Sequence, residues 1–414
     1  MDGVMHMRMA RWACRKVEEK YPVWGAHSED AAVSSTYPDA YIFGEDAKNK
    51  TGWDPLWREL DQIPTEQGPR PAQTIFDTLR LRETYPIVFR YLIHLSVESL
   101  RASRDELGVK AAGTLSHLIG DTVQAAHTTD NRMVTAMYPM GSWRYMTHAF
   151  MEAVFAELPD SVPYAPRLLA DSEEMLCWRL CEELEKDKRL SIGEIPNLMG
   201  ALRRGDQRAA EESAYRSAMT GAQLLADVML TLSRLADGTA KDVGAIDLAG
   251  LEPLACDVDN MFNYEPMIDL IPGERFDSPT ALDIGEGDTH GLCLLPMMAP
   301  SYQGRREAWV AYTLPGCGLT AFEARLGIQR FHAPERIPFH ARGNETSVFF
   351  EIRLDDQCVW RSEAIDETTP PTPVHVPLGS AKKLTIYVCD TRVCDPLTKF
   401  VYPVVEKPRL ILAL

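Results

Sequence analysis

Hydrophobic positions recur at helical spacing through the first half of the chain, with apolar residues on one face of each expected helix. This pattern covers residues 86–126, 143–157, 166–187 and 207–236. A shorter helix is expected at about 5–20, and a loop-rich stretch follows over roughly 22–70. Asp-Gly after residue 236 is typical of a helix end. The pattern predicts an all-helical domain in this half of the chain.

The pattern changes to alternation after residue 275. Short runs rich in β-branched and aromatic residues, such as AWVAYTL, SVFFEIRL and KLTIYVCD, are separated by turn residues. Such strands predict an all-β sandwich of the jelly-roll kind. The segment before them has little periodicity and several prolines and glycines, so it is expected to be a linker or packing segment. The expected domains are helical over 1–245, linker over 246–275 and β-sandwich over 276–414, a multi-domain chain of α and β parts.

The composition and charge of the chain limit the classes of partner that it is expected to bind. A chain of 414 residues with 45% hydrophobic content suits two domains with sizeable cores. The formal net charge of −17 argues against a stable nucleic-acid complex, because phosphate binding needs clustered Lys and Arg. No apolar run approaches the roughly 18 residues of a transmembrane segment, so none is expected. The first residues show no secretory signal peptide.

Metal-capable side chains cluster in the stretch GTLSHLIGDTVQAAHTTDN. His117 and Asp121 are four residues apart and share a helix face. His148 and Glu152 repeat this spacing in HAFME. His127 can join the first pair only if the helix bends or ends near Gln124–Ala126. One such pair alone is typical of a helix salt bridge, but the whole set favours a metal site, and imidazole with carboxylate suits zinc.

These residues resemble the zinc-dependent phospholipase C and single-strand-specific nuclease superfamily. Its enzymes are all-helical with a three-zinc site, and their pattern is His-x3-Asp-x5-His followed by His-x3-Glu or Asp. All five positions match in this chain. The resemblance implies one zinc held by His127, His148 and Glu152. It implies a second zinc held by His117 and Asp121, with Asp121 bridging towards a third.

The resemblance also implies residues earlier in the chain. An early-loop aspartate that orients or deprotonates the attacking water corresponds to Asp39, and a histidine at the start of the first helix corresponds to His6. The family has a further histidine about fourteen residues after that aspartate; here Asp54 is the nearest oxygen ligand, since no histidine lies between 27 and 94. The third zinc of the family also uses an N-terminal tryptophan, and no tryptophan precedes Trp12. Two or three zinc ions are therefore implied, with one site lost or altered.

The implied reaction is hydrolysis of a phosphate ester, in a phospholipid or a nucleotide. Clustered zinc ions lower the pKa of bound water to about 7 and neutralise charge on a phosphoryl oxygen. Trp143 and Tyr145 are candidates to stack on a base or pack on acyl chains, with ordinary core packing as the alternative. The leading interpretation is a phospholipase C-like phosphoesterase. A single-strand nuclease and a non-catalytic surface- or glycan-binding protein with a degenerate metal site are the alternatives.

The β-rich half resembles a carbohydrate-binding-module domain of the NPCBM type, on GDTHGLCLLP and PVHVPLGSAKKLTIYVCD. That jelly-roll domain accompanies secreted glycan-active enzymes, so the resemblance implies a glycan or surface partner and a secreted or cell-surface location. His290, in the His-Gly of this pattern, is interpreted as structural. Phe349 and Trp360 alternate within strands and His94 lies on an apolar helical run, so all three are expected in cores.

Overall fold

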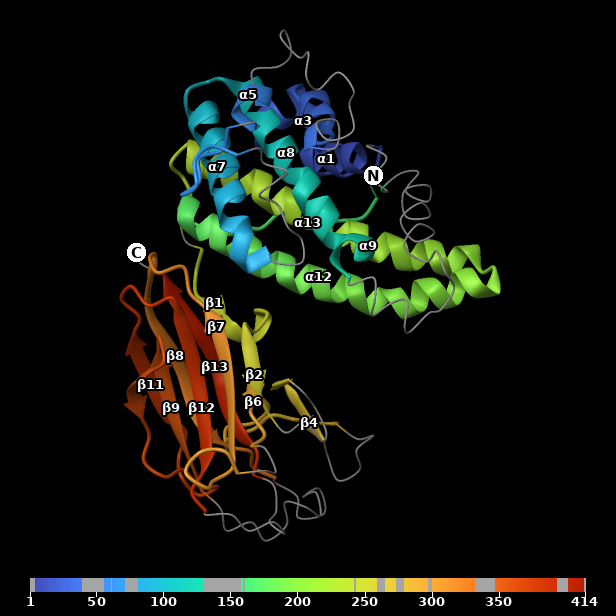
Figure 1. Cartoon of the computed structure of the whole chain (residues 1–414). Helices are drawn as coiled ribbons and strands as arrows, with labels where there is room; N and C mark the ends of the chain where they lie inside the picture. The colour runs from blue at the N-terminus through green and yellow to red at the C-terminus, as the bar shows by residue number, and fades with distance from the viewer. Residues whose placement is uncertain are drawn as a thin grey trace. The chain divides into compact units, whose positions relative to one another are not determined.

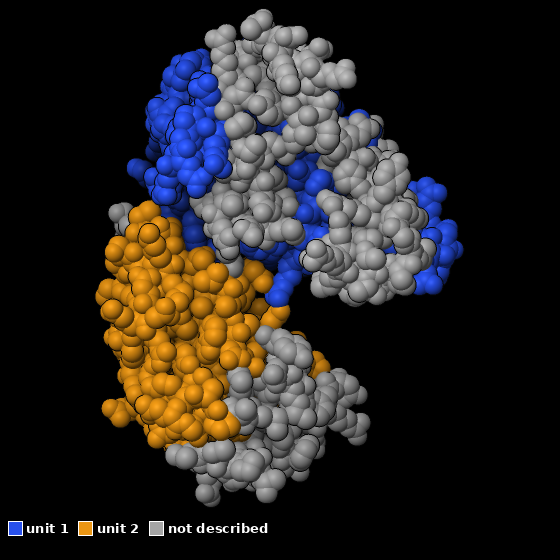
Figure 2. Space-filling view, in the orientation of Figure 1, with its two compact units in different colours: residues 1–243 blue, residues 244–414 orange. Residues whose placement is uncertain are grey.

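The chain forms two compact units, residues 1–243 and 244–414, in a computed structural model (Figures 1 and 2). The first unit is helical and the second is built of antiparallel sheets, which confirms the predicted fold class. The described residues are 4–38, 56–60, 62–70, 81–129, 158, 161–241, 243–258, 265–272, 279–296, 300–331, 347–392 and 401–412.

Helices account for most of the described part of the first unit. They are α1 (Val4–Val17), α2 (Pro22–Ala26), α3 (Ser28–Ser34), α5 (Leu56–Leu60), α7 (Leu81–Arg101), α8 (Asp105–Val123), α9 (Ala125–Thr128), α12 (Glu173–Arg204) and α13 (Gln207–Ala236). None of these described helices is long and apolar enough to cross a bilayer.

Three helical expectations need correction. The stretch predicted as loop after α1 contains α2 and α3, which are too short for a helical period to show in the sequence. The helix predicted over 86–126 is broken twice, because the chain turns between α7 and α8, where Ser103 has a φ of 54°, and again between α8 and α9 at Gln124. The helix expected to end at 187 continues to Arg204.

The longest described helices, α12 and α13, form a hairpin whose ends are capped by polar side chains. Ser172 accepts a hydrogen bond from the backbone N–H of Met175 at 3.4 Å and starts α12. Gly205, in the left-handed conformation with φ 68°, ends it. Asp206 then starts α13 by accepting from the N–H of Ala209 at 3.2 Å. The Gly-Asp pair therefore sets the sharp reversal between the two helices (Figure 1).

Two sheets form the second unit. Among the described residues, one has six strands in the order β11-β8-β13-β6-β3 with β1 also paired to β13, and the other has five in the order β10-β9-β12-β7-β2. Their bounds are β1 (Ile246–Asp247), β2 (Ala255–Asp257), β3 (Met267–Ile268), β6 (Gly291–Cys293), β7 (Glu307–Thr313), β8 (Leu319–Ile328), β9 (Val348–Leu354), β10 (Gln357–Arg361), β11 (Thr372–Pro377), β12 (Lys383–Asp390) and β13 (Pro403–Leu412). A separate pair joins β4 (Leu270–Pro272) to β5 (Pro279–Ala281).

The segment expected as a linker over 246–275 differs from that expectation. Its described residues belong to the second unit and supply β1, β2, β3 and β4. Strands of two or three residues are too short to show alternation, so the sequence pattern does not reveal them. The boundary between the two units lies between residues 243 and 244.

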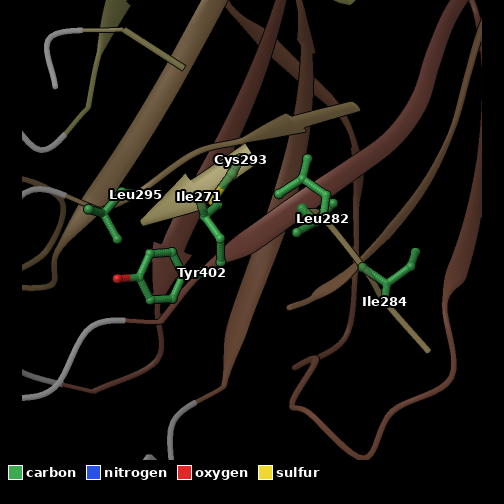
Figure 3. Packing of buried hydrophobic residues seen from close by; sticks show 7 residues of the cluster. Ile271, Leu282, Ile284, Cys293, Leu295 and Tyr402 are labelled. Carbon is green, nitrogen blue, oxygen red and sulfur yellow. The ribbon is translucent and has the colours of Figure 1, made fainter. Parts of the chain in front are cut away.

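The two sheets lie face to face (Figure 1). Burial alternates along the edge strand β11, whereas the first five residues of β9 are all buried. A second cluster joins the β4–β5 pair to the six-stranded sheet (Figure 3). Its buried members are Ile271, Leu282, Ile284, Cys293, Leu295, Tyr402 and Val404. Phe349 is buried as expected, at 5% exposure. Trp360 is only half-buried, because it lies on the edge strand β10 beside a register shift.

Candidate metal centre

Three histidines surround one buried carboxylate in the helical unit. Asp121 lies on α8, and its Oδ2 is 3.4 Å from Nε2 of His117. Its Oδ1 is 3.5 Å from Nε2 of His6 on α1 and 3.7 Å from Nε2 of His127 on α9. His6 and His117 are fully buried, and Asp121 is 5% exposed. Potential ligand atoms of His6, His117 and Asp121 lie within 4.8 Å of one another.

A backbone carbonyl fixes the ring of His117. Nδ1 of His117 is 2.8 Å from the carbonyl oxygen of Ser35, which follows α3. A carbonyl only accepts, so Nδ1 carries the proton and the neutral ring has its lone pair on Nε2, facing Asp121. The close crossing of α3 and α8 makes this contact possible, because Gly113 leaves room where a Cβ would collide with Ser34 and Ala31. A metal-binding histidine commonly has its other nitrogen held in this way.

The ring of His6 occupies space that a side chain at position 120 would fill. A Cβ on Gly120 would lie 2.5 Å from Nδ1 of His6. The ring stacks on that of His117, with centroids 4.1 Å apart and planes at 28°. Glycine at 120 therefore brings α1 and α8 together at the residues that face Asp121.

The helix end expected near Gln124–Ala126 lies there. α8 stops at Val123, and Gln124 adopts an extended conformation with ψ 111°. The chain then starts the short helix α9, which carries His127. This break turns His127 towards the carboxylate that His117 also faces, although an unbroken helix would have pointed the two rings apart.

The donor set and its spacing fit a metal ion of the zinc type. The three N···O distances of 3.4–3.7 Å exceed the about 2.7–3.2 Å of an N–H···O hydrogen bond. Two ligands each about 2.0–2.1 Å from a tetrahedral zinc ion are roughly 3.4 Å apart, so the spacing matches ligands of a shared ion better than direct pairs. Oδ1 of Asp121 is buried and accepts no hydrogen bond within the described residues.

The charge state of Asp121 is the one that a metal ligand requires. Burial acts to raise the pKa of its carboxyl group, but positive charge on His117 and His127, when these rings are protonated in the metal-free protein, outweighs burial and holds that pKa well below its ordinary value. The carboxylate is therefore ionised at neutral pH, as a metal ligand must be.

The remaining site predictions fall on positions outside the described residues. They are Asp39, Asp54, Trp143, Tyr145, His148 and Glu152. The described structure thus brings together His6, His117, Asp121 and His127, and the metal-binding or catalytic roles of all the predicted site residues stay predictions.

His94 is not the core histidine that the sequence suggested. Its side chain is 62% exposed, and Nδ1 is 2.9 Å from Oε2 of Glu173. Together with Glu98, these side chains could hold a cation on the surface, where acidic groups are well solvated without one. His94 lies on the exposed face of α7. The apolar residues beside it in the sequence do not show which face of the helix is exposed.

Two contributors to the centre were missed by sequence reasoning. The carbonyl of Ser35 carries no side-chain signal, and Gly120 is an ordinary small residue within a helical pattern. Only the packing of α1 and α3 on α8 assigns them a role.

A domain family matches part of the second unit. Residues 302–395 match the NPCBM/NEW2 domain. This confirms the resemblance found in the β-rich half, on the strands from β7 to β12. No curated protein matches the chain.

Solved structures resemble the chain loosely. The M60 catalytic domain with CBM51-1 and CBM51-2 domains of Clostridium perfringens ZmpB is 19% identical with a TM-score of 0.28, over 41% of this chain and 15% of that one. CBM51 of the Clostridium perfringens GH95 protein, solved with methyl-galactose, is 19% identical with a TM-score of 0.27, over 40% and 99%. Alpha toxin from Clostridium absonum is 10% identical with a TM-score of 0.32, over 99% and 94%. Likenesses with TM-scores this low say nothing about activity.

Proposed function

We propose that the helical unit is a zinc-dependent phosphoesterase that hydrolyses phosphodiester bonds in the manner of a phospholipase C. The observation that carries this proposal is the group of the buried His6 and His117 and the half-buried His127 around Asp121, with N···O distances of 3.4–3.7 Å that suit metal ligands. The ligand spacing in the sequence, which resembles the zinc-dependent phospholipase C and nuclease superfamily, supports the same reaction class.

The protein side chains have distinct parts in this proposal. The carbonyl of Ser35 holds the proton on Nδ1 of His117, so that Nε2 is available as a ligand atom. His148 and Glu152 would complete the ligand set with His127, and Asp54 would replace the absent loop histidine. Asp39 would accept a proton from the attacking water. Zinc, when bound, supplies hydroxide at neutral pH and offsets charge on a phosphoryl oxygen.

A phospholipid head group suits the chain better than a nucleic acid as substrate. The net charge of −17 repels a polyanion along its whole length, whereas one phosphodiester meets only the metal centre. A single-strand nuclease is therefore the second candidate. A non-catalytic binding protein is the third, favoured by the absence of any histidine between 27 and 94.

The second unit would place the enzyme on its target. The NPCBM/NEW2 match over 302–395 supports a glycan- or surface-binding role for this unit. Such a partner lies outside the cell, so we propose a secreted or cell-surface protein.

Metal content and hydrolysis test the proposal together. We expect two or more zinc ions per chain, and zinc-dependent cleavage of a phosphatidylcholine emulsion or a chromogenic phosphodiester in preference to single-stranded DNA. Asp121→Asn and His117→Ala should lose at least one zinc and lower the rate by a hundredfold or more. His375→Ala, which removes an exposed histidine of the other unit, is the matched control.

The outcomes separate the candidates. Preferential cleavage of single-stranded DNA would favour the nuclease. A fully zinc-loaded protein that cleaves none of the three substrates would refute the enzyme and favour the binding protein.

A further inference from the structure

A pocket of about 340 Å³ lies between α12 and α13, and none of its lining residues belongs to the histidine group. From α12 it is lined by Asp187, Leu190 and Glu194. From α13 it is lined by Tyr215, Arg216, Ser217, Met219, Thr220 and Gln223. Its size is that of a site for a small molecule.

Asp187 lies in this pocket without a partner. It is 6% exposed, and within the described residues no hydrogen bond or ion pair reaches its carboxyl group. Three neighbouring carboxylates are each matched to an arginine. Glu183 pairs with Arg179 at 2.6 Å, Asp227 with Arg167 at 2.9 Å and Glu194 with Arg216 at 2.7 Å. A buried carboxylate without a donor or cation is costly, so a ligand that brings one gains affinity there.

The walls of the pocket restrict the kind of cation. Leu190, Met219 and the ring of Tyr215 offer alkyl, thioether and aromatic surface. Glu194, the other carboxylate of the described lining, is already paired with Arg216, which leaves Asp187 as its one carboxylate without an ion pair. Calcium would need six to eight oxygen ligands, and magnesium retains several waters, so a single unpaired carboxylate suits neither ion. An organic ammonium group attached to a short apolar body can pair with the carboxylate and pack on these walls.

We propose that the α12–α13 pocket binds a small organic cation, an ammonium group on a short alkyl body, with Asp187 as its counter-ion. Thr220 and Gln223, which also line the pocket, provide polar contacts for a hydroxyl or amide on the same ligand. This site is independent of the proposed hydrolysis and would operate in a catalytic or a non-catalytic protein.

The acidity of Asp187 makes the binding dependent on pH. Burial raises the pKa of its carboxyl group to about 8; Glu183 and Asp227 add to the rise, while Lys186 and Arg167 oppose it. The Glu194–Arg216 pair also faces the pocket and is close to neutral as a unit. A cation must displace the proton, so affinity for a permanent cation should rise about tenfold per pH unit up to about pH 8 and then level off.

Calorimetric titration of the full chain with n-butylammonium tests this proposal, with n-butanol as the uncharged counterpart of the same shape. We expect one saturable site for n-butylammonium and at least tenfold weaker binding of n-butanol. Asp187→Asn should weaken n-butylammonium binding at least tenfold. Glu185→Gln, which removes a carboxylate paired with Lys188 at 2.8 Å on the same helix, should bind like the wild type. Tetramethylammonium, which cannot lose a proton, reports the pH dependence.

A thermal unfolding curve guards against misfolding of the variant. The amide of Asp187→Asn has the shape of the carboxyl group without its charge, so its unfolding midpoint at pH 8 should equal or exceed that of the wild type. Equal affinity of the wild type and Asp187→Asn would overturn the proposal. So would the absence of binding, or tetramethylammonium affinity that falls between about pH 6 and about pH 9.

Discussion

Gly120 is the residue on which the position of His6 depends. A methyl group there would overlap the imidazole ring, whose Nδ1 is 2.5 Å from the ideal Cβ position. The ring has little freedom to withdraw, because it is fully buried and stacked on His117. Helix propensity alone favours alanine over glycine by about 1 kcal/mol. A fall in the free energy of unfolding on Gly120→Ala would therefore come from the overlap with the ring.

We therefore expect Gly120→Ala to lower zinc affinity at least tenfold and the free energy of unfolding by about 1–3 kcal/mol. Zinc competition with a chromogenic chelator and urea unfolding of the metal-free protein measure the two effects. Gly193→Ala is the matched control, since Gly193 lies within α12 and a Cβ there meets nothing within 4 Å. It should gain about 0.5–1 kcal/mol with unchanged zinc affinity. Wild-type zinc affinity in Gly120→Ala would contradict a ligand role for His6.

At the scale of elements, local pattern explains what the sequence could predict. The alternation in KLTIYVCD predicts a strand, and β12 covers the same residues. The sequence pattern does not predict β13, because Pro403 and Pro408 interrupt its apolar residues, and a register shift with Lys407 at φ 47° breaks its alternation. Such a strand becomes recognisable only through pairing with β8 and β6.

The candidate centre, too, could be predicted from local sequence pattern only in part. The spacing of His117 and Asp121 predicts a shared helix face, and the polar stretch after Gln124 predicts the break that turns His127. His6 lies more than a hundred positions away in the sequence, and only the family resemblance suggested it. Its contact with Asp121 depends on helix crossings at glycine, which are tertiary features without a local signal.

His290 joins three short elements of the β unit. Its Nε2 is 2.7 Å from Oδ2 of Asp247 in β1, and its Nδ1 is 2.7 Å from Oδ1 of Asp269, between β3 and β4. Burial acts to lower the pKa of His290, but hydrogen bonds and charge from Asp247 and Asp269 outweigh it and raise that pKa above its ordinary value. The imidazolium can donate to both carboxylates, whereas the neutral ring can donate to only one.

The stabilising effect of His290 should therefore be complete below about pH 6.5 and decline as pH rises through the higher folded-state pKa. We expect the unfolding midpoint of the β unit to fall over this window in the wild type and to fall less in His290→Gln. Differential scanning calorimetry across the pH range measures both slopes. His375→Gln removes an exposed histidine from β11 and controls for general loss of an imidazole. Identical slopes in the wild type and His290→Gln would show that the carboxylates do not stabilise the charged ring.

At the scale of the whole molecule, each unit has its own core. Met9, Leu118 and Leu225 are buried within the helices, whereas Phe322, Ile352 and Ile386 are buried within the sandwich. Units with separate cores commonly unfold in separate transitions. A ligand that binds one folded unit raises the unfolding temperature of that unit alone, because a ligand stabilises only the native state to which it binds.

Removal of metal should therefore lower the unfolding temperature of the helical unit and leave that of the β unit unchanged. A site loaded at a thousandfold excess over its dissociation constant contributes about 4 kcal/mol, which corresponds to on the order of 10 °C for a unit of this size. Calorimetry before and after EDTA, followed by zinc, measures the shift and its reversal. Chains 1–243 and 244–414, prepared separately, identify the two transitions. Asp121→Asn should abolish much of the EDTA effect without moving the β transition. A shift of the β transition instead would place the metal in the sandwich and contradict the histidine group as the centre.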